Sequence, residues 1–364
     1  MARWIETEEA AARLGVKRET LYAYVSRGLI GRTPHPDGKR SLFDADAIEG
    51  LRARSRRRAR GELGTILTTS ITNVRDTGLE YRGRALARCV RDGLEPTLAR
   101  LWQVDSVEIP RVHDTPKLGV GLDRLRAAVI HARTLEPMPY DPNVAIGGAR
   151  LVGAMLDAVG RASSDPIEGL WRGLSAQRWD RLRRRALETA WVALLDHGLA
   201  TSTFAVRVAA STRADLFSCV SSGLGALAGP LHGAASAAVH RLFERAAQLD
   251  ASSALAEVGA HVPGTGHSVY RDRDPREAVV MTALRAAWRD DPRWATVARL
   301  RKVVGERALL NVDFALGALT WLAEMDASAG ELIFAVARTG GWCAHVAEEW
   351  GEAPLRFRPQ ARYA

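Results

Sequence analysis

The spacing of apolar positions predicts a largely helical protein. From about residue 62 onward, apolar residues recur at intervals of three and four, which is the period of an α-helix with one buried face. The pattern is clearest over residues 186–208, 223–246, 276–288 and 312–325. Strand-like alternation is rare: residues 104–107 are a weak candidate, and residues 65–81 suit a short hairpin. Because strands and helices do not alternate, the pattern predicts an all-α body and no Rossmann fold.

The first fifty residues follow a different plan. Residues 7–15 predict a short helix, because a threonine suits the N-cap, two glutamates follow it, and Gly15 suits the end. After a tight turn, residues 16–25 predict a second helix with Leu21 on its buried side. Two short helices joined by a glycine-containing turn form the helix-turn-helix pattern.

A hairpin and a third helix are predicted next. Residues 29–30 and 41–43 flank Asp37-Gly38, which is a strong two-residue turn signal. Asp44 then caps a further helix. The stretch as a whole, residues 3–52, resembles the winged helix-turn-helix of MerR and excisionase type.

This resemblance implies binding to double-stranded DNA by a domain over residues 1–52. The side chains expected to contact phosphates and base edges lie on the second helix and at the hairpin. They are Lys17, Arg18, Thr20, Tyr22, Tyr24, Lys39 and Arg40. The alternative is a small helical adaptor that only packs against the main body.

Positive charge is concentrated in the same region. Residues 1–60 carry 14 Lys+Arg and 8 Asp+Glu, whereas the remaining chain carries 37 and 34. Such an asymmetry favours a polyanion-binding module at this end of the chain. The arginine run over residues 52–60 predicts a basic linker, residues 53–64, which can add phosphate contacts without reading sequence.

The sequence also excludes several classes of protein. No apolar run reaches the roughly 18 residues that a membrane span needs, and the three cysteines are too far apart for a disulfide framework or a zinc ribbon. We therefore expect a cytoplasmic protein with no metal and no tightly bound cofactor. The motifs GxSxG and HExxH and the Walker lysine are absent, which excludes the corresponding hydrolases, zincins and P-loop enzymes. Gly223, Gly225 and Gly229 are spaced one position too far for a dinucleotide fingerprint.

Histidines and arginines in unusual settings carry the strongest signal. His197 lies at an expected helix break, His232 lies just before a helix, and His267 follows a Gly-Thr-Gly loop. The motifs, in chain order, cover residues 195–204, 229–236, 263–270, 274–276, 311–314, 334–342 and 357–363. In this order they resemble the motifs of the citrate synthase family, and the resemblance spans residues 65–364.

The resemblance implies a mainly α, two-domain body. Its large domain is expected over residues 65–234 and 321–364, and its small domain over residues 235–320. The family reaction is a Claisen-type condensation of acetyl-CoA with oxaloacetate that gives citrate and CoA.

The resemblance also assigns chemical roles. Asp313 is the base that removes a weakly acidic proton from acetyl-CoA. His232 donates to the enolate oxygen, and His267 donates to the ketone oxygen of oxaloacetate. The glycines of the Gly264-Thr265-Gly266 loop allow backbone N–H groups to approach the acyl-CoA closely.

Oxaloacetate is a dianion, and planar guanidinium groups suit its carboxylates. By resemblance, Arg276, Arg338 and Arg358 bind them, and His197 helps to hold the same substrate. In the family, an arginine near the C-terminus reaches into the partner's active site. Arg358 therefore implies a homodimer.

Several neighbouring positions depart from the family pattern. Gly198 stands where a glutamate usually follows the first histidine, Ala234 and Ser236 replace a glycine–asparagine pair, and Gln360 replaces a second arginine. Changes of this kind around a site can lower the rate and leave the fold intact.

Two hypotheses follow. The first is a citrate synthase-like acyltransferase with a DNA-binding appendage, and propionyl-CoA, giving 2-methylcitrate, is a close variant of its substrate. The second is a transcriptional regulator whose former enzyme domain senses oxaloacetate or an acyl-CoA.

Overall fold

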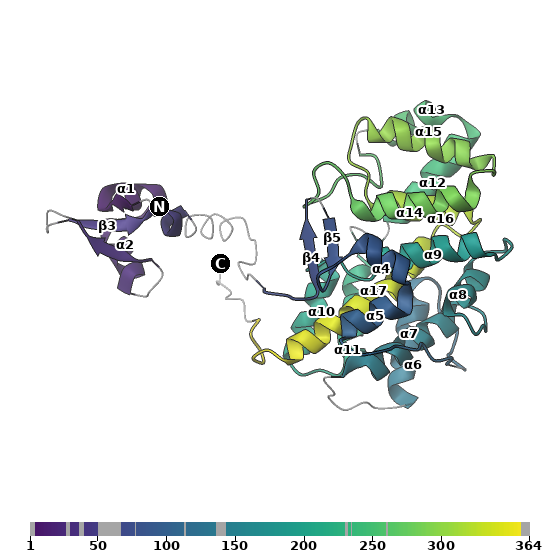
Figure 1. Cartoon of the computed structure of the whole chain (residues 1–364), viewed down its shortest axis with the longest axis horizontal. Coiled ribbons are helices and arrows are strands. Elements are labelled where there is room, and N and C mark those ends of the chain that lie inside the picture. The colour runs from purple at the N-terminus through teal and green to yellow at the C-terminus, as the bar shows by residue number, and fades with distance from the viewer. Residues whose placement is uncertain are drawn as a thin grey trace. The chain divides into compact units, whose positions relative to one another are not determined.

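The computed structural model forms two compact units, one within residues 1–68 and one within residues 69–358. It describes residues 4–26, 30–35, 40–49, 67–76, 78–112, 114–135, 143–229, 232–233, 235–259 and 261–357 (Figure 1). Each unit has a hydrophobic core of its own.

The first unit combines short helices with a small antiparallel sheet. Its elements are β1 (Trp4–Glu6), α1 (Thr7–Leu14), α2 (Arg18–Ser26), β2 (Arg32–Pro34) and β3 (Ser41–Asp44), followed by helical residues 45–49. The strand order is β1-β3-β2, with Ile5 and Arg32 both opposite Phe43. Gly15, at φ +66°, ends α1 and turns the chain into α2.

The predicted order of helix, turn, helix, paired strands and helix is present in this unit. Two details differ from the prediction. The first strand of the pair lies at Arg32–Pro34 rather than at residues 29–30, and β1 was not expected. The turn at Asp37-Gly38 and the linker over residues 53–64 lie outside the described residues.

The second unit opens with a small sheet of β4 (Thr72–Arg75), β5 (Gly78–Tyr81) and β6 (Arg84–Ala85), which confirms the hairpin predicted over residues 65–81. Helices make up most of the rest. They are α4 (Leu86–Asp92), α5 (Leu94–Trp102), α6 (Leu122–Leu135), α7 (Val144–Val159), α8 (Pro166–Leu174), α9 (Arg181–Leu194), α10 (Thr201–Ser211), α11 (Leu216–Leu227), α12 (Ala235–Gln248), α13 (Ala251–Val258), α14 (Pro275–Trp288), α15 (Arg293–Gly305), α16 (Val312–Leu322) and α17 (Ala329–Trp350). The prediction of a mainly helical body is confirmed.

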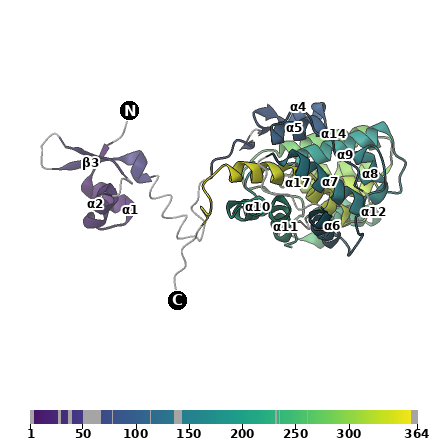
Figure 2. The ribbon, with the colours of Figure 1, turned by 90° about the horizontal axis from the view of Figure 1, so that it is seen from below.

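Helix α17 forms the centre of this unit. Its 22 residues are almost all buried, and it packs against α5, α7, α9, α10 and α11 (Figures 1 and 2). Helices α12 to α16 gather at one end of the body. Among the described residues, no helix is both long and apolar enough to cross a membrane.

Two long apolar stretches are each divided between two helices. The stretch over residues 186–208 is divided between α9, which ends at Leu194, and α10, which begins at Thr201. The stretch over residues 223–246 is divided between α11, which ends at Leu227, and α12, which begins at Ala235. Periodicity alone misses these breaks because apolar spacing continues across them, and the breaks carry His197 and His232. The weak strand predicted over residues 104–107 is wrong, since these residues form no strand.

Candidate active site

His197 lies in the break between α9 and α10. Its Nε2 lies 3.0 Å from the hydroxyl oxygen of Tyr270, and its ring meets that of His267 edge to face with centroids 4.8 Å apart. Gly198, at φ +62°, follows it, and the backbone N–H of Gly198 donates to Asp196 Oδ2 at 2.9 Å. Burial, together with Arg276 and other positive neighbours, lowers the pKa of His197 to about 2. The imidazole is therefore neutral at physiological pH.

His267 has a defined tautomer. Its Nδ1 accepts the backbone N–H groups of Val269 at 3.0 Å and Tyr270 at 3.1 Å. Burial and Arg276 lower the pKa of the ring, so the neutral form dominates. Because Nδ1 is an acceptor, the single proton of that neutral ring lies on Nε2. His267 is thus a donor through Nε2, as its predicted role requires.

His232 lies between α11 and α12 and contacts both α10 and α17. Its Nε2 is 2.9 Å from Ser202 Oγ, and its ring lies 6.0 Å from that of Phe334. Its pKa is lowered by burial first and by the charge of Arg338 second. The neutral form of the His232 imidazole is therefore favoured, mainly by burial.

Arg276 is held in the first turn of α14 by the residue that caps the helix. Asp274 accepts the backbone N–H of Arg276 at 2.9 Å and also binds its guanidinium at two points, Nε–Oδ1 at 3.0 Å and Nη2–Oδ2 at 2.7 Å. Asp274 Oδ2 also accepts the N–H of Val312 at 3.1 Å, which joins α14 to α16. Nη1 of Arg276 has no partner within the described part of the chain.

Arg338 is a buried arginine with no carboxylate partner in the part of the chain that the structure describes. Only 1% of it is exposed, its Nε donates to the carbonyl of Leu194 at 2.8 Å, and its guanidinium lies 4.5 Å from the ring centroid of Phe334. Neither Nη nitrogen has a hydrogen bond to any described residue. A buried charge left unpaired is costly, and burial accordingly lowers the pKa of Arg338. An anionic ligand would compensate this cost.

Asp313 lies in the first turn of α16. Asn311 caps the helix by accepting the N–H of Asp313 at 3.0 Å, whereas the carboxylate of Asp313 makes no hydrogen bond to the described residues. Burial, and then the negative Asp274, raise its pKa to about 6, although Arg276 and Arg338 oppose the shift. A carboxylate of this kind is ionised at neutral pH and is a stronger base than an ordinary aspartate.

The Gly264-Thr265-Gly266 loop is fixed to the start of α16. The backbone N–H of Gly266 donates to the carbonyl of Leu309 at 2.7 Å, and the N–H of Asn311 donates to the carbonyl of Gly264 at 3.0 Å. Both glycines have positive φ, +75° and +78°. Since the N–H of Gly266 already donates to Leu309, it is not one of the backbone N–H groups that could approach the acyl-CoA.

Comparison with known proteins identifies the family. Residues 127–360 match the family described as citrate synthase, C-terminal domain. The chain belongs to the citrate synthase family. It is 34% identical over 200 residues to the citrate synthase of Haloferax volcanii, which is 52% of each chain. It is also 34% identical over 189 residues to the 2-methylcitrate synthase of Mycobacterium tuberculosis, or 49% of this chain and 47% of that protein. The chain spans about half the length of the curated relatives that it matches.

Solved structures of citrate synthases share the fold. The enzyme of Thermotoga maritima superposes with a TM-score of 0.67 at 23% identity, over 82% of this chain and 93% of that one. A ternary complex of the Thermoplasma acidophilum citrate synthase with carboxymethyl coenzyme A and oxaloacetate superposes with a TM-score of 0.68 at 20% identity, over 82% and 94% of the two chains.

Six side chains to which the citrate synthase resemblance assigned roles in catalysis or oxaloacetate binding lie around one site. Ring contacts join His197 and His267 through Tyr270, and Phe334 lies against both His232 and Arg338. The charges of Arg276 and Arg338 both act on His197 and on Asp313, which connects the two groups. The six are His197, His232, His267, Arg276, Asp313 and Arg338. The seventh, Arg358, lies outside the described residues. Sequence reasoning gave no role to Tyr270 or Asp274, although the Asp-Pro pair before Arg276 is a typical helix start.

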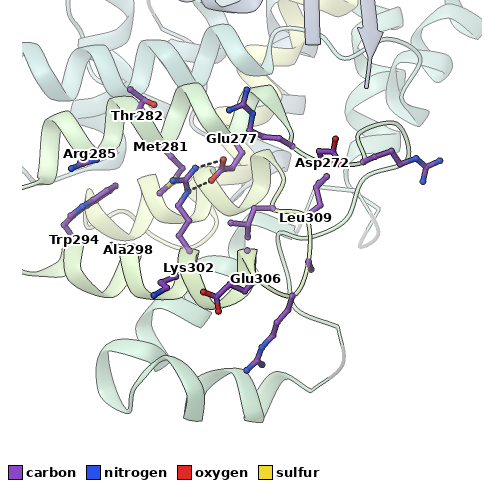
Figure 3. Close-up of a pocket in the computed structure, with 17 residues that line it drawn as sticks. Asp272, Glu277, Met281, Thr282, Arg285, Trp294, Ala298, Lys302, Glu306 and Leu309 are labelled. Carbon is purple, nitrogen blue, oxygen red and sulfur yellow. Dashed lines mark hydrogen bonds and ion pairs between the residues drawn. The ribbon is translucent and has the colours of Figure 1, made fainter. Parts of the chain in front are cut away.

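A basic pocket of about 1100 Å³ lies between α14, α15 and the residues that lead into α16 (Figure 3). Six cationic side chains line it, namely Arg271, Arg273, Arg285, Arg301, Lys302 and Arg307. The acidic side chains that line it are Asp272, Glu277 and Glu306. Glu277 is already neutralised by Arg301, with Nε–Oε1 at 2.7 Å and Nη2–Oε2 at 3.0 Å. Leu309 lines the pocket and also binds Gly266, so the pocket adjoins the Gly264-Thr265-Gly266 loop.

The predicted DNA-contacting side chains differ in exposure. Lys17, Arg18 and Arg40 are exposed, whereas Thr20, Tyr22 and Tyr24 are half-buried. Both tyrosines pack against the core of the first unit, so the prediction that they lie towards an exposed face needs correction. Arg40 pairs with Glu6 at 2.7 Å. Lys39 lies outside the described residues, and no cluster of metal ligands occurs among those that are described.

Proposed function

We propose that the helical body condenses an acyl-CoA with oxaloacetate, giving citrate and CoA when the acyl group is acetyl. The observation that carries this proposal is Asp313, a carboxylate with a raised pKa and no hydrogen-bond partner among the described residues, close to the buried Arg276 and Arg338. Burial and the same arginines lower the pKa values of the site histidines. Family membership and the ternary complex of the Thermoplasma acidophilum enzyme support it.

In the proposed reaction, Asp313 takes the proton from the carbon next to the thioester carbonyl. His232 donates a hydrogen bond to the enolate oxygen that forms. The enolate carbon attacks the ketone carbon of oxaloacetate, and His267 gives its Nε2 proton to the ketone oxygen. Water then cleaves the thioester, which releases citrate and the CoA thiol.

Different side chains suit the two substrates. Arg338, with both Nη nitrogens without a partner among the described residues, and Arg276, with Nη1 in the same state, suit the two carboxylates of oxaloacetate. We propose that the phosphates of the acyl-CoA bind in the basic pocket between α14 and α15, where cationic side chains outnumber acidic ones. A homodimer, with Arg358 contributed by the partner, completes the proposed site.

Acetyl-CoA and propionyl-CoA are both candidate substrates. The chain is equally similar, at 34% identity, to a citrate synthase and to a 2-methylcitrate synthase. One methylene changes binding in an apolar pocket by only about 1–3 kcal/mol.

The test is release of the CoA thiol from each acyl-CoA in the presence of oxaloacetate, with Asp313→Asn as the control. Turnover that disappears in Asp313→Asn supports the proposal, and the preferred acyl group decides between citrate and 2-methylcitrate. Absence of turnover with both substrates, in folded protein, rejects it.

We propose, as a second function, that the first unit binds double-stranded DNA. Lys17 and Arg18 are exposed at the start of α2, the second helix of a helix-turn-helix arrangement. Duplex binding should weaken steeply with salt. The double variant Arg18→Ala/Arg40→Ala should lose it, and binding that persists in this variant rejects the proposed surface.

The two proposals also define a third case, a ligand-sensing regulator. A body that binds oxaloacetate or acyl-CoA without turnover, attached to a first unit that binds DNA, would act as a ligand sensor. Ligand binding by calorimetry beside the turnover assay separates this case from an enzyme.

A further inference from the structure

A buried chain of polar side chains runs from the His197 loop to the C-terminal segment. Its members are Asp196, His345, Arg207, Glu349 and Arg356, which we call the Asp196–Arg356 chain. Asp196, His345, Arg207 and Glu349 are each 0% exposed. Four separate parts of the second unit meet in it: the α9–α10 break, α10, α17 and the residues after α17.

Each member of the chain contacts the next. His345 Nε2 lies 3.2 Å from Asp196 Oδ1, and Arg207 Nη1 donates to His345 Nδ1 at 3.0 Å. Arg207 Nε donates to Glu349 Oε2 at 2.8 Å. Arg356 binds the same carboxylate at two points, both at 2.6 Å.

The chemistry of arginine sets the orientation of His345. Arg207 can only donate, so Nδ1 of His345 must accept. A ring that accepts at Nδ1 carries its proton on Nε2, which lies 3.2 Å from Asp196 Oδ1.

Asp196 in turn shapes the loop that carries His197. Its Oδ1 faces His345, while its Oδ2 accepts the N–H of Gly198 at 2.9 Å. The carboxylate thus spans His197, the residue between Asp196 and Gly198. A close approach of α17 holds the same loop, because a Cβ at Gly341 would lie 2.2 Å from the carbonyl oxygen of Leu195.

We propose that His345 is a positioning residue for His197, acting through Asp196. The inference rests on the proposed function in one respect, that His197 holds oxaloacetate. Loss of the outer partner of a metal-ligating side chain typically costs 10–100-fold in affinity or activity, and we expect a loss of the same order here. Loss of His345 should weaken oxaloacetate binding and leave acyl-CoA binding unchanged, because the acyl-CoA has its own proposed pocket.

Three variants of the full-length protein test this role. His345→Leu removes both contacts of the ring, and His345→Gln retains an N–H donor for Asp196. His240→Leu is the matched control, because His240 is also buried, 4% exposed, and its Nδ1 lies 2.9 Å from Thr320 Oγ1, away from the Asp196–Arg356 chain.

Calorimetry should show the oxaloacetate dissociation constant about tenfold higher in His345→Leu, which corresponds to about 1.4 kcal/mol. We expect an unchanged acyl-CoA constant in that variant, recovery towards wild-type affinity in His345→Gln, and wild-type affinity in His240→Leu. Equal weakening of both ligands in His345→Leu, or wild-type oxaloacetate binding by it, would overturn the inference.

A second readout does not depend on any ligand. In ¹⁵N-histidine NMR spectra, His345→Leu should shift the His197 ring signals, and His240→Leu should not. If wild-type protein fails to bind oxaloacetate, the proposed function fails, yet the spectra still decide whether His345 positions His197. An unshifted His197 signal in His345→Leu refutes the positioning role.

Discussion

At the scale of single residues, burial acts on acids and bases in opposite directions within one small site. It raises the pKa of Asp313 to about 6 and lowers those of His197, His232 and His267. Both shifts have the same cause, because a low dielectric disfavours whichever form is charged. The outcome at neutral pH is a reactive carboxylate beside neutral imidazoles, which are the protonation states that the proposed condensation needs.

The opposite pKa shifts of Asp313 and the histidines predict a pH profile with a single rise in turnover. The rate should rise with pH through about 6, where Asp313 loses its proton, and then level off. The three site histidines should add no second limb above this rise, because their pKa values are lowered from the ordinary 6.5. Initial rates of thiol release through and above this rise test the prediction, and a rate that still changes on the alkaline side of about pH 7 would contradict it.

Asp313→Asn should abolish turnover and stabilise the fold at neutral pH. The folded-state pKa, about 6, exceeds the ordinary value of 3.8, so the carboxyl group stabilises the fold fully only below about pH 4. That contribution is lost as pH rises through 6. The difference between the two pKa values corresponds to about 3 kcal/mol of unfolding free energy. Because the side chain of Asp313 is partly exposed, we expect Asp313→Asn to raise the free energy of unfolding by only about 1–2 kcal/mol.

Urea unfolding of wild type and Asp313→Asn at about pH 5 and pH 8 measures this effect. The variant's advantage should be larger at the higher pH. An advantage that shrinks as pH rises would show that Asp313 is stabilised as an anion.

Arg338→Lys should weaken oxaloacetate binding and leave acyl-CoA binding unchanged. Lysine keeps the charge but lacks the planar fork that would bind a carboxylate at two points. We expect the KM for oxaloacetate to rise roughly 10–100-fold, as for loss of a charged hydrogen bond, with an unchanged KM for acyl-CoA. Arg276→Lys is the comparison, because it also breaks the pair with Asp274 and should lower stability as well. An unaltered oxaloacetate KM in Arg338→Lys would remove Arg338 from the site.

At the scale of elements, His197, His232 and His267 lie outside the helices, whereas Arg276, Arg338 and Asp313 lie within them. His197 and His232 occupy breaks between helices, and His267 lies in the segment that leads to α14. Arg276 and Asp313 lie in the first turns of α14 and α16, where Asp274 and Asn311 act as caps. Capping thus starts each helix and, through Asp274, also orients Arg276.

The Gly264-Thr265-Gly266 loop permits a matched pair of substitutions. Both glycines have positive φ, so alanine at either position costs about 1–2 kcal/mol. At Gly264 the new Cβ would also lie 2.7 Å from Val239 Cγ2 and 2.9 Å from Phe314, whereas at Gly266 nothing lies within 4 Å. Urea unfolding should show a loss of unfolding free energy that is larger by about 1–3 kcal/mol for Gly264→Ala than for Gly266→Ala, as overpacking typically costs. Equal losses would mean that α12 and α16 can move apart without cost.

Part of this arrangement was predictable from local sequence. The helical period predicts α14 and α16 closely, because the apolar spacing is uninterrupted over residues 276–288 and 312–325. The break at His197 was anticipated, but the length of the gap was not, since apolar residues continue on both sides. Tyr22 was expected on an exposed face, yet it packs against Phe43 from a strand 21 positions later in the chain.

Other features depend on contacts that no local pattern contains. Asp196 is separated from His345 by about 150 positions, and the pairing follows from the path of α17 through the body. The pairing of Asp274 with Arg276 is local, but its hydrogen bond to Val312 is not. The burial that causes the pKa shift of Asp313 likewise comes from helices distant in the sequence.

At the scale of the whole molecule, the two units have separate hydrophobic cores. The core of the first unit comprises Ile5, Ala10, Leu21, Ile30, Phe43, Ala45 and Ile48. A core of this size gives only marginal stability, because small domains bury a small share of their surface. The body, with its much larger core, should not need the first unit in order to fold.

Two variants test this independence. Phe43 is 0% exposed, so Phe43→Ala should cost about 3–5 kcal/mol, enough to unfold the first unit. Both Phe43→Ala and deletion of residues 1–60 should abolish duplex binding and leave thiol release and the main thermal transition of the body unchanged. Calorimetric scans beside the turnover assay measure both effects. A body transition that falls with Phe43→Ala would show that the units unfold together, and turnover lost in both variants would show that catalysis requires the folded first unit.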